Sequence, residues 1–297
     1  MTANLQYKQP TTPTIRQLLL SAVQQLARAS ESAQLDAEIL LAHVLDRPRT
    51  WLRTWPEYTV SQSDHNAYQK IITQRQSGVP VAYLAGKRDF WLHCFQVCPD
   101  VLIPRPDTEL LVELALKIIP ADKPYAILEL GTGSGIISIS LGAERPASRI
   151  TATDISAQAL SIAGNNAESI GVPNIDFVQG NWFSGLDGNA YDFIISNPPY
   201  VEENDPHLYQ GDVRFEPRMA LSSGHDGLRD IRVIASQARD YLADNAYLAI
   251  EHGYNQADAV KRILSEHQYT NIKNHRDLQN NPRVTIAQYP KPNQRLK

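Results

Sequence analysis

Apolar and polar residues follow helical spacing over the first 85 residues of the chain. Thr14 is suited to cap a helix that runs to about Leu26, with apolar residues recurring on one face. Similar patterns cover residues 32–45 and 63–76, and a glycine and a proline follow the last of them as a stop signal. Because helices this short need partners to bury their apolar faces, we expect residues 1–85 to form a small helical bundle.

The hydrophobic pattern changes beyond this bundle. Residues 86–103 alternate in parts with a period of two, which predicts a β-hairpin linking two domains. From Tyr125 onward strands and helices alternate, as is typical of an α/β fold with a parallel sheet and crossover helices. The predicted strands cover residues 126–130, 149–154, 175–179, 191–196, 246–251, 269–274 and 283–288. The predicted helices cover residues 110–119, with Asp107 or Thr108 as cap, and then 135–142, 157–170, 228–242 and 256–267.

A glycine-rich turn joins the first of these strands to its helix. It reads Glu129-Leu130-Gly131-Thr132-Gly133-Ser134-Gly135, and glycines there let the backbone adopt positive φ and approach a ligand closely. A dinucleotide-binding turn would need Gly or Ala three positions after Gly133, where this chain has Ile136. The turn matches instead the E/D-x-G-x-G-x-G loop of S-adenosylmethionine-dependent methyltransferases. We therefore expect this cofactor to be bound by Gly131, Thr132, Gly133, Ser134 and Gly135.

The next two strands end in further candidate cofactor ligands. Asp154 ends the second strand, where an acid accepts hydrogen bonds from ribose hydroxyls, although alone it would also serve as N-cap for the helix beginning near Ala157. Asn181 and Trp182 follow the third strand, where an aromatic or short polar side chain suits an adenine ring and its amine. Trp182 would equally anchor this loop to the core.

The fourth strand runs directly into Asn197-Pro198-Pro199-Tyr200. Proline has no N–H, so this corner offers carbonyl oxygens and the Asn197 amide oxygen as acceptors. Such a corner suits a planar –NH2 group, and Tyr200 adds a flat apolar face. A plain strand-ending turn is the alternative, since Asn-Pro is a common turn dipeptide. Together with the glycine loop, the tetrad predicts methyl transfer to an –NH2 group.

Composition narrows the class of protein further. The 297 residues are 42% hydrophobic and 20% charged, as in ordinary globular domains, and no apolar run reaches the ~18 residues of a membrane span. The polar start of the chain lacks a signal-peptide pattern, so we expect a cytoplasmic protein. Cys94 and Cys98 beside His93 are too few to close a metal site, and we expect no metal. A net charge of −4 disfavours direct nucleic-acid binding modestly.

From about residue 75 to 283 the sequence resembles the peptide-chain release factor glutamine N5-methyltransferases. Besides the glycine loop and the tetrad, the resemblance rests on Arg75, Gly78-x-Pro80-x-x-Tyr83-x-x-Gly86, Phe90, Leu102-Ile103-Pro104-Arg105-Pro106-Asp107-Thr108-Glu109, Phe215-Glu216-Pro217-Arg218 and Gly224-x-Asp226-Gly227. The tetrad also occurs in adenine-N6 DNA and RNA methyltransferases, whereas the segment from Leu102 to Glu109 is much more restrictive. Two mild departures are Asn181, where the family commonly has Asp, and Asp107, where Glu is usual.

The resemblance implies three parts of the chain. These are an N-terminal helical substrate-recognition domain at 1–85, a linking β-hairpin at 86–103, and a seven-stranded Rossmann-like class I methyltransferase domain at 104–297. It implies S-adenosylmethionine as co-substrate and class-one peptide chain release factors as partners, methylated on the glutamine of their Gly-Gly-Gln loop. By family motif, Asn197, Pro198, Pro199 and Tyr200 would hold that glutamine, and Asn197 would also contact the cofactor.

Four alternatives stay open at this point. A ribosomal-protein glutamine methyltransferase and an adenine-N6 nucleic-acid methyltransferase share the chemistry of an –NH2 acceptor. A non-catalytic cofactor-binding module is disfavoured by the intact tetrad, and a Rossmann oxidoreductase is disfavoured by Ile136.

Overall fold

A computed structural model describes residues 12–188 and 190–290. The chain divides into two compact units, Met1–Gly86 and Lys87–Lys297, and each is described by itself. The polar stretch on which the expectation of no export signal rests falls mainly on residues 1–11, outside the described residues.

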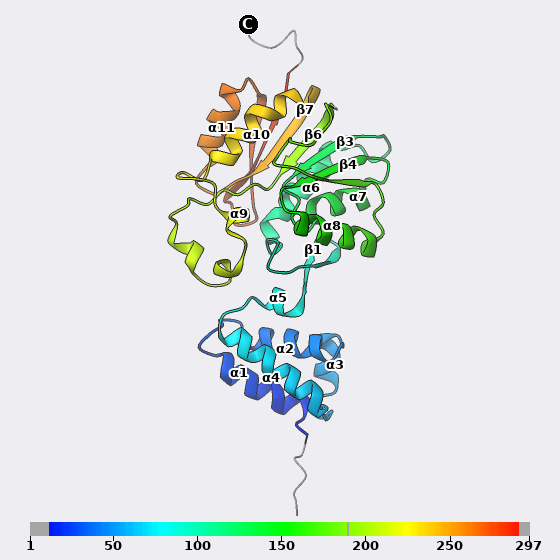
Figure 1. Cartoon of the computed structure of the whole chain (residues 1–297), viewed down its shortest axis with the longest axis vertical. Helices are drawn as coiled ribbons and strands as arrows, with labels where there is room; N and C mark the ends of the chain where they lie inside the picture. Colours follow the sequence, from blue (N-terminus) through cyan, green and yellow to red (C-terminus); the bar gives the residue numbers. More distant parts are fainter. Residues whose placement is uncertain (1–11, 189, 291–297) are drawn as a thin grey trace, which may run out of the picture. The chain divides into compact units, whose positions relative to one another are not determined.

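The first unit is the predicted helical bundle, drawn blue to cyan in Figure 1. Its helices are α1 Ile15–Leu26, α2 Ala33–Val44, α3 Arg49–Thr54, α4 Gln62–Gln76 and α5 Val81–Ala85. Thr14 caps α1 as expected, because its hydroxyl accepts from the Gln17 N–H and the Gln17 side chain accepts in return. In the core between α2 and α4, the buried Tyr68 hydroxyl donates to the Ala37 carbonyl at 3.0 Å.

The second unit begins with the predicted hairpin. Strands β1 Lys87–Phe90 and β2 His93–Gln96 pair antiparallel. Phe90 and Phe95 are buried and pack with the helix and sheet residues of this unit. The hairpin therefore packs into the hydrophobic core of the second unit.

The main sheet has seven strands in the order β5-β4-β3-β6-β7-β9-β8, which agrees with the seven-stranded α/β fold expected from the sequence. The first five strands of this order run parallel, and β9 pairs antiparallel with both β7 and β8. The strands are β3 Ala126–Leu130, β4 Arg149–Asp154, β5 Ile175–Gln179, β6 Tyr191–Ser196, β7 Leu242–Glu251, β8 Thr270–Arg276 and β9 Pro282–Gln288.

Helices cover both faces of this sheet (Figure 1). One face packs against α6 Glu109–Ile118, α7 Ile136–Glu144 and α8 Ala157–Ile170. The other packs against α10 Arg229–Gln237 and α11 Ala257–Glu266. Short helical segments lie in the loops, namely η1 Pro106–Thr108, η2 Pro206–Tyr209, η3 Val213–Phe215, α9 Arg218–Leu221 and η4 Ala238–Asp240.

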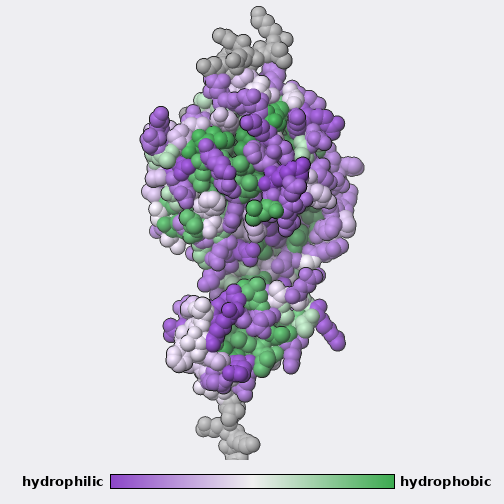
Figure 2. All heavy atoms as spheres, turned by 180° about the vertical axis from the view of Figure 1, so that it is seen from behind, coloured by the Kyte–Doolittle hydropathy of each residue, from purple (hydrophilic) through white to green (hydrophobic). Residues whose placement is uncertain are grey.

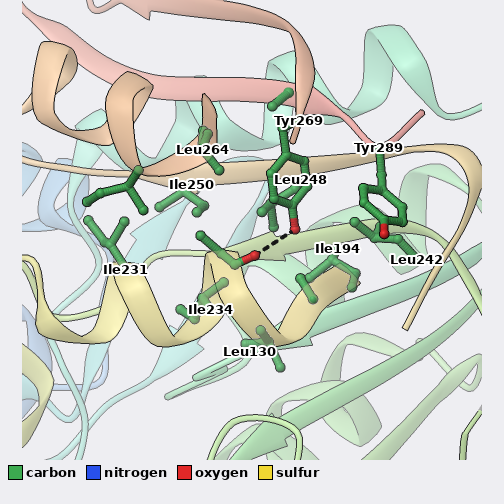
Figure 3. Close-up of a cluster of buried hydrophobic side chains, with 14 of the residues drawn as sticks. Leu130, Ile194, Ile231, Ile234, Leu242, Leu248, Ile250, Leu264, Tyr269 and Tyr289 are labelled. Atoms are coloured by element: carbon green, nitrogen blue, oxygen red, sulfur yellow. Dashed lines mark hydrogen bonds between the residues drawn. The ribbon is translucent and has the colours of Figure 1, made fainter. Parts of the chain in front are cut away.

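Figure 3 shows how the second of these faces is filled. Ile194 and Leu248 from the central strands pack with Ile234 of α10, and all three are fully buried. The Tyr269 hydroxyl donates to the carbonyl of Ala235 at 3.0 Å, which satisfies a polar group that burial would otherwise penalise. This packing holds the central strands rigid beneath their carboxyl ends.

The helix predicted at residues 228–242 is wrong at its end. Helix α10 stops at Gln237, the 3₁₀ segment η4 follows, and Leu242 already begins strand β7. Leu242 pairs there with Tyr191 of β6. The strand therefore starts earlier than its own apolar run indicates, because a neighbouring strand supplies hydrogen-bonding partners that local sequence does not reveal.

The surface in Figure 2 is mostly hydrophilic, with hydrophobic atoms in separate areas of each unit. Within residues 12–188 and 190–290, no helix combines the length and the hydrophobicity that a bilayer crossing requires.

Candidate functional site

The carboxyl ends of the central parallel strands meet at one edge of the sheet. The register aligns Leu130 of β3 with Thr153 of β4 and with Ser196 of β6. The next residue of each strand therefore lies in one row, and these residues are Gly131, Asp154 and Asn197. Ligands of open α/β sheets bind at this edge.

A cavity of about 530 Å³ opens beside this row, within the roughly 300–1,000 Å³ typical of small-molecule sites. The predicted site residues that line it are Gly131, Thr132, Gly133, Ser134, Asp154, Asn181, Trp182, Asn197 and Pro199. Three other predicted residues, Gly135, Pro198 and Tyr200, are not part of its wall. Residues from the segment before α6 and from the loop after the tetrad complete the wall, among them Arg105, Thr108 and Met219.

The glycine loop is fastened to the neighbouring strand by its backbone. The N–H groups of Gly131 and Thr132 donate to the Thr153 carbonyl at 2.8 and 2.9 Å. Gly131, Gly133 and Gly135 all have positive φ, at 73°, 56° and 84°, a conformation that other residues adopt only with strain. Gly135 also lies so close to α7 and α8 that an added Cβ would be 2.7 Å from a methyl carbon of Ile139. It therefore shapes the loop from behind the cavity.

Asp154 holds the loop and faces the cavity. Its Oδ2 accepts from the Gly133 N–H at 2.8 Å, and its Oδ1 accepts from the Ser156 N–H at 2.9 Å. Each carboxylate oxygen keeps further acceptor capacity. The alternative role as N-cap of α8 is wrong, because Ser156 is the N-cap and accepts from the Ala159 N–H.

Glu129 begins the glycine-loop motif but was not among the predicted ligands. It is 1% exposed, and its Oε2 accepts from the Thr132 hydroxyl and the Ser138 N–H. Its Oε1 is buried without a hydrogen-bond partner among the described residues, although Glu129 lines the cavity. Burial raises its pKa to about 7. The sequence offered one signal for such a role. Glu129 is an acidic residue within an otherwise apolar strand, and a buried acidic group needs a partner.

The loop after β5 forms another part of the wall. Asn181 is exposed, whereas Trp182 is half-buried and packs against the core beside the sheet. Trp182 has a φ of 55°, and its backbone is held by the Thr153 hydroxyl, which donates to the Trp182 carbonyl at 3.2 Å. Its ring approaches Gly131, where an added Cβ would lie 3.6 Å from it. Trp182 therefore anchors this loop to the core and also lines the cavity, and its contact with an adenine ring stays a prediction.

The tetrad after β6 contributes Asn197 and Pro199 to the cavity wall, and Pro198 lies between them in the chain. The Asn197 side-chain Nδ2 donates to the Thr108 hydroxyl at 3.0 Å. Within the part of the chain that the structure describes, neither the Asn197 Oδ1 nor the Pro198 carbonyl accepts a hydrogen bond. The prolines add no donor. An –NH2 group entering this corner would meet two free acceptors.

Thr108 was predicted, with Asp107, as a cap for the helix at 110–119, and Thr108 does occupy the N-cap position of α6, but it makes no side-chain capping bond. Neither side chain caps α6, which continues directly from η1. The fully buried Thr108 hydroxyl accepts from Asn197 instead, and Asp107 pairs with Arg283 at 3.1 Å. A tertiary partner has replaced the local capping bond.

Tyr200, the last residue of the tetrad, lies outside the cavity wall. Its hydroxyl donates to Glu251 Oε1 at 3.4 Å, its carbonyl accepts from the Gln256 Nε2 at 2.9 Å, and burial raises its pKa. Glu251 and His252, at the carboxyl end of β7, do not line the cavity. His252 is fully buried and its ring nitrogens contact Gly253 and Thr285.

A buried ion pair joins the segment before α6 to the loop after the tetrad. Glu216, whose side chain is fully buried, accepts from the Arg105 guanidinium and from the Ile103 N–H. Burial raises the pKa of the Glu216 carboxyl, and the Arg105 charge opposes this rise. Pro217, which follows the pair, and Met219 line the cavity. The end of the 202–219 loop is thus part of the wall.

The sheet order, the glycine loop and the acceptor corner together define a Rossmann-like methyltransferase. Family models agree: residues 17–86 match the PrmC N-terminal domain, and residues 107–212 match the methyltransferase small domain. The release factor glutamine methyltransferase of Vibrio cholerae is 45% identical over 93% of this chain and 97% of its own length. That of Escherichia coli is 44% identical over 91% and 97%. The chain belongs to the family of release factor glutamine methyltransferases.

A crystal structure of a methyltransferase from Pyrococcus furiosus superimposes with a TM-score of 0.52. The match covers 75% of this chain and 98% of that chain at 17% sequence identity. At this identity the likeness shows the shared fold alone.

Gly227 is required where the tetrad contacts the loop that follows it. Its φ is 69°, and an added Cβ would lie 2.2 Å from the Tyr200 carbonyl oxygen. Gly227→Ala is expected to lower the thermal unfolding midpoint more than Gly211→Ala, whose φ of 52° imposes similar strain but whose Cβ would meet nothing within 4 Å. In each variant the alanine must adopt a left-handed backbone conformation, which costs about 1–2 kcal/mol. Only Gly227→Ala adds a steric clash. Equal midpoints would contradict this account.

Proposed function

We propose that this chain transfers a methyl group from S-adenosylmethionine to the side-chain amide nitrogen of a glutamine in a protein. The glutamine is that of the Gly-Gly-Gln loop of class-one peptide chain release factors, as the names of the relatives and the sequence resemblance support. The observation that carries the proposal is that Asn197 lines the cavity, and that within residues 12–188 and 190–290 neither its Oδ1 nor the adjacent Pro198 carbonyl accepts a hydrogen bond. Such a substrate belongs to the cytoplasm, where translation ends.

The residues around the cavity fit S-adenosylmethionine. Glu129 lines the cavity and has a buried oxygen with no hydrogen-bond partner among the described residues, which suits the ligand's ammonium group. Asp154 has acceptor capacity for ribose hydroxyls, and Asn181 and Trp182 offer a polar group and a ring for adenine. When bound, this molecule supplies an electrophilic methyl group on a sulfonium. The proposed cofactor ligands are Gly131, Thr132, Gly133, Ser134, Gly135, Asp154, Asn181, Trp182 and Asn197, with Glu129 added.

The glutamine amide nitrogen is a poor nucleophile because its lone pair is conjugated with the carbonyl group. The amide rotation barrier of about 18–20 kcal/mol gives the scale of this conjugation. In our proposal the Asn197 Oδ1 and the Pro198 carbonyl each accept one N–H and orient the lone pair toward the methyl group. Positioning of this kind is worth roughly 7–11 kcal/mol.

The same two acceptors stabilise the positive charge that develops on the nitrogen. This electrostatic effect is stronger where water is excluded, and Pro199 and the half-buried Tyr200 limit water at the corner. The methylated nitrogen is strongly acidic, so the mechanism assigns no general base.

The direct test is methylation of a purified, unmodified release factor with labelled S-adenosylmethionine. Ribosomes, RNA and DNA are assayed in parallel. We expect label on the release factor, at its Gly-Gly-Gln glutamine, and none on a factor whose glutamine is replaced by alanine. Label on ribosomal protein or nucleic acid alone would overturn the proposal.

Asn197→Ala separates substrate positioning from cofactor binding. We expect turnover to fall by about 100-fold or more, as when one preorganised polar group is removed from an active site. The dissociation constant for S-adenosylmethionine, measured by calorimetry, should change far less. An equal loss of turnover and affinity would point to a role in holding the cofactor alone.

The raised pKa of Glu129 leads to a prediction of how the affinity for S-adenosylmethionine depends on pH. Because burial raises its pKa to about 7 and a bound cation favours the ionised form, binding lowers that pKa. Affinity should therefore rise as the pH rises toward 7, by at most tenfold per pH unit, and be lost as pH falls through 7. Glu129→Gln should bind more weakly at pH 7 and show a flatter profile.

Stability gives an independent readout of the same group. The pKa of Glu129 is raised from 4.5 in the folded protein, so the unfolded chain loses this proton first as pH rises. The contribution of Glu129 to stability is therefore lost between about pH 4.5 and 7. In the absence of ligand, the thermal unfolding midpoint of Glu129→Gln should rise relative to that of the wild type as the pH increases over this range. Parallel stability profiles would contradict the assigned pKa.

A further inference from the structure

Asn166 lies in α8 and contacts both the glycine loop and the linking hairpin. Its side chain is buried and bonds to backbone groups of two distant segments. The Nδ2 donates to the Ser134 carbonyl at 2.9 Å and to the Gln96 carbonyl at 3.1 Å. The Oδ1 accepts from the Gln96 N–H at 2.7 Å. One amide therefore joins strand β2 to a loop that lines the cavity.

These partners leave the Asn166 amide a single orientation. Its –NH2 group faces two carbonyl oxygens, and its oxygen faces an N–H group. A reversed amide would set its oxygen against both carbonyls and its –NH2 group against a donor, so all of these hydrogen bonds would be lost. Because the bond to the Ser134 carbonyl is buried, loss of this donor is costly.

The bond to Ser134 fixes the end of the glycine loop that β4 does not hold. Hydrogen bonds to β4 hold residues 131–133. The peptide group between Ser134 and Gly135 comes next, and Asn166 donates to its carbonyl. The N–H of this peptide group donates to the Thr132 carbonyl at 2.9 Å. Asn166 therefore helps to set the turn in which the loop passes into α7 through the positive φ of Gly135.

The other two hydrogen bonds attach the linking hairpin to the same amide. Phe95 of β2 is buried in the core of the second unit, and the next residue, Gln96, uses both its backbone N–H and its carbonyl for Asn166. None of the described residues of β1 and β2 lines the cavity. The hairpin directly follows the helical unit, which ends at Gly86. Its connection to the cavity thus runs through Asn166.

We propose that Asn166 is a positioning residue for the cofactor, which keeps the glycine loop in the conformation that binds S-adenosylmethionine and couples that loop to the linking hairpin. This inference rests on the proposed ligand of the cavity, and it adds a residue that lies outside the cavity wall. Without the amide, the buried Ser134 carbonyl loses its donor and the loop leaves this conformation. The observed affinity then falls with the fraction of molecules that still have the loop in place.

Asn166→Asp tests this role in the full chain with almost no change of shape. The carboxylate can still accept from the Gln96 N–H, but it cannot donate to either carbonyl. We expect the dissociation constant for S-adenosylmethionine, measured by calorimetry, to rise by about 10-fold or more, the scale of one buried carbonyl left without its donor.

The matched control is Asn165→Asp, which makes the same change at the preceding and exposed residue of α8. Its affinity for S-adenosylmethionine should equal that of the wild type. An Asn166→Asp variant that binds as tightly as Asn165→Asp would overturn the proposal.

The kinetic constants separate positioning from damage to the fold. In Asn166→Asp the KM for S-adenosylmethionine should rise, while kcat on the release factor at saturating S-adenosylmethionine stays within about threefold of wild type, as expected when binding alone is weakened. Partial unfolding would instead lower kcat and leave KM unchanged, because fewer molecules would be active. That result would contradict the positioning role.

Amide hydrogen exchange tests the coupling in the unmodified protein. Because coupling between two sites is reciprocal, S-adenosylmethionine should slow exchange of the Gln96 N–H more than exchange in β8, at the far edge of the sheet. This extra protection should vanish in Asn166→Ala. Equal effects on Gln96 and β8 in the wild type would overturn the coupling. Binding of S-adenosylmethionine without methylation of a release factor would defeat only the proposed substrate.

Discussion

Parallel pairing in one register is the constraint on which the candidate site depends. Because Leu130, Thr153, Ser196 and Ile250 stand level across four strands, the residues after them stand level too. Glycine, two acids and an amide from four distant segments thus form one row at the edge of the sheet. A slip of one residue in any strand would turn its side chains to the opposite face. The helices on both faces prevent such a slip by burying alternate residues of every central strand.

Three buried carboxyl groups stand around this row, and each organises a different part of the site. Glu129 holds the glycine loop through Thr132 and Ser138, Glu216 holds the segment at Arg105, and Glu251 lies behind Tyr200 and Thr108. Burial raises the pKa of all three. Each charge is costly in the interior and is retained with polar partners around it. The protein thus keeps three carboxyl groups buried at this edge, where they accept hydrogen bonds from hydroxyl, N–H and guanidinium groups.

Local sequence predicted four of the parallel strands well. Strands β3, β4 and β6 contain buried apolar residues, whereas β5 lies at the edge of the sheet and has no fully buried residue. The strands at residues 126–130, 149–154, 175–179 and 191–196 begin and end where expected. Short apolar runs bounded by glycine, proline or polar residues leave little freedom in such boundaries. Strand β7 began earlier than expected, because pairing with β6 extends it beyond its apolar run. The role of Thr108 was mispredicted for a related reason. Its local sequence is typical of a helix cap, and only the folded chain places its hydroxyl beside the Asn197 side chain.

The sequence by itself determined the fold class, the glycine loop and the acceptor character of Asn197-Pro198-Pro199-Tyr200, because these follow from backbone chemistry within a few residues. It also pointed to the family, which the similarity of the whole chain shows. Only the tertiary structure decided which buried groups serve that corner. Thr108 and Asn197 are separated by 89 residues, and the hydrogen bond between their side chains exists only once the chain has folded.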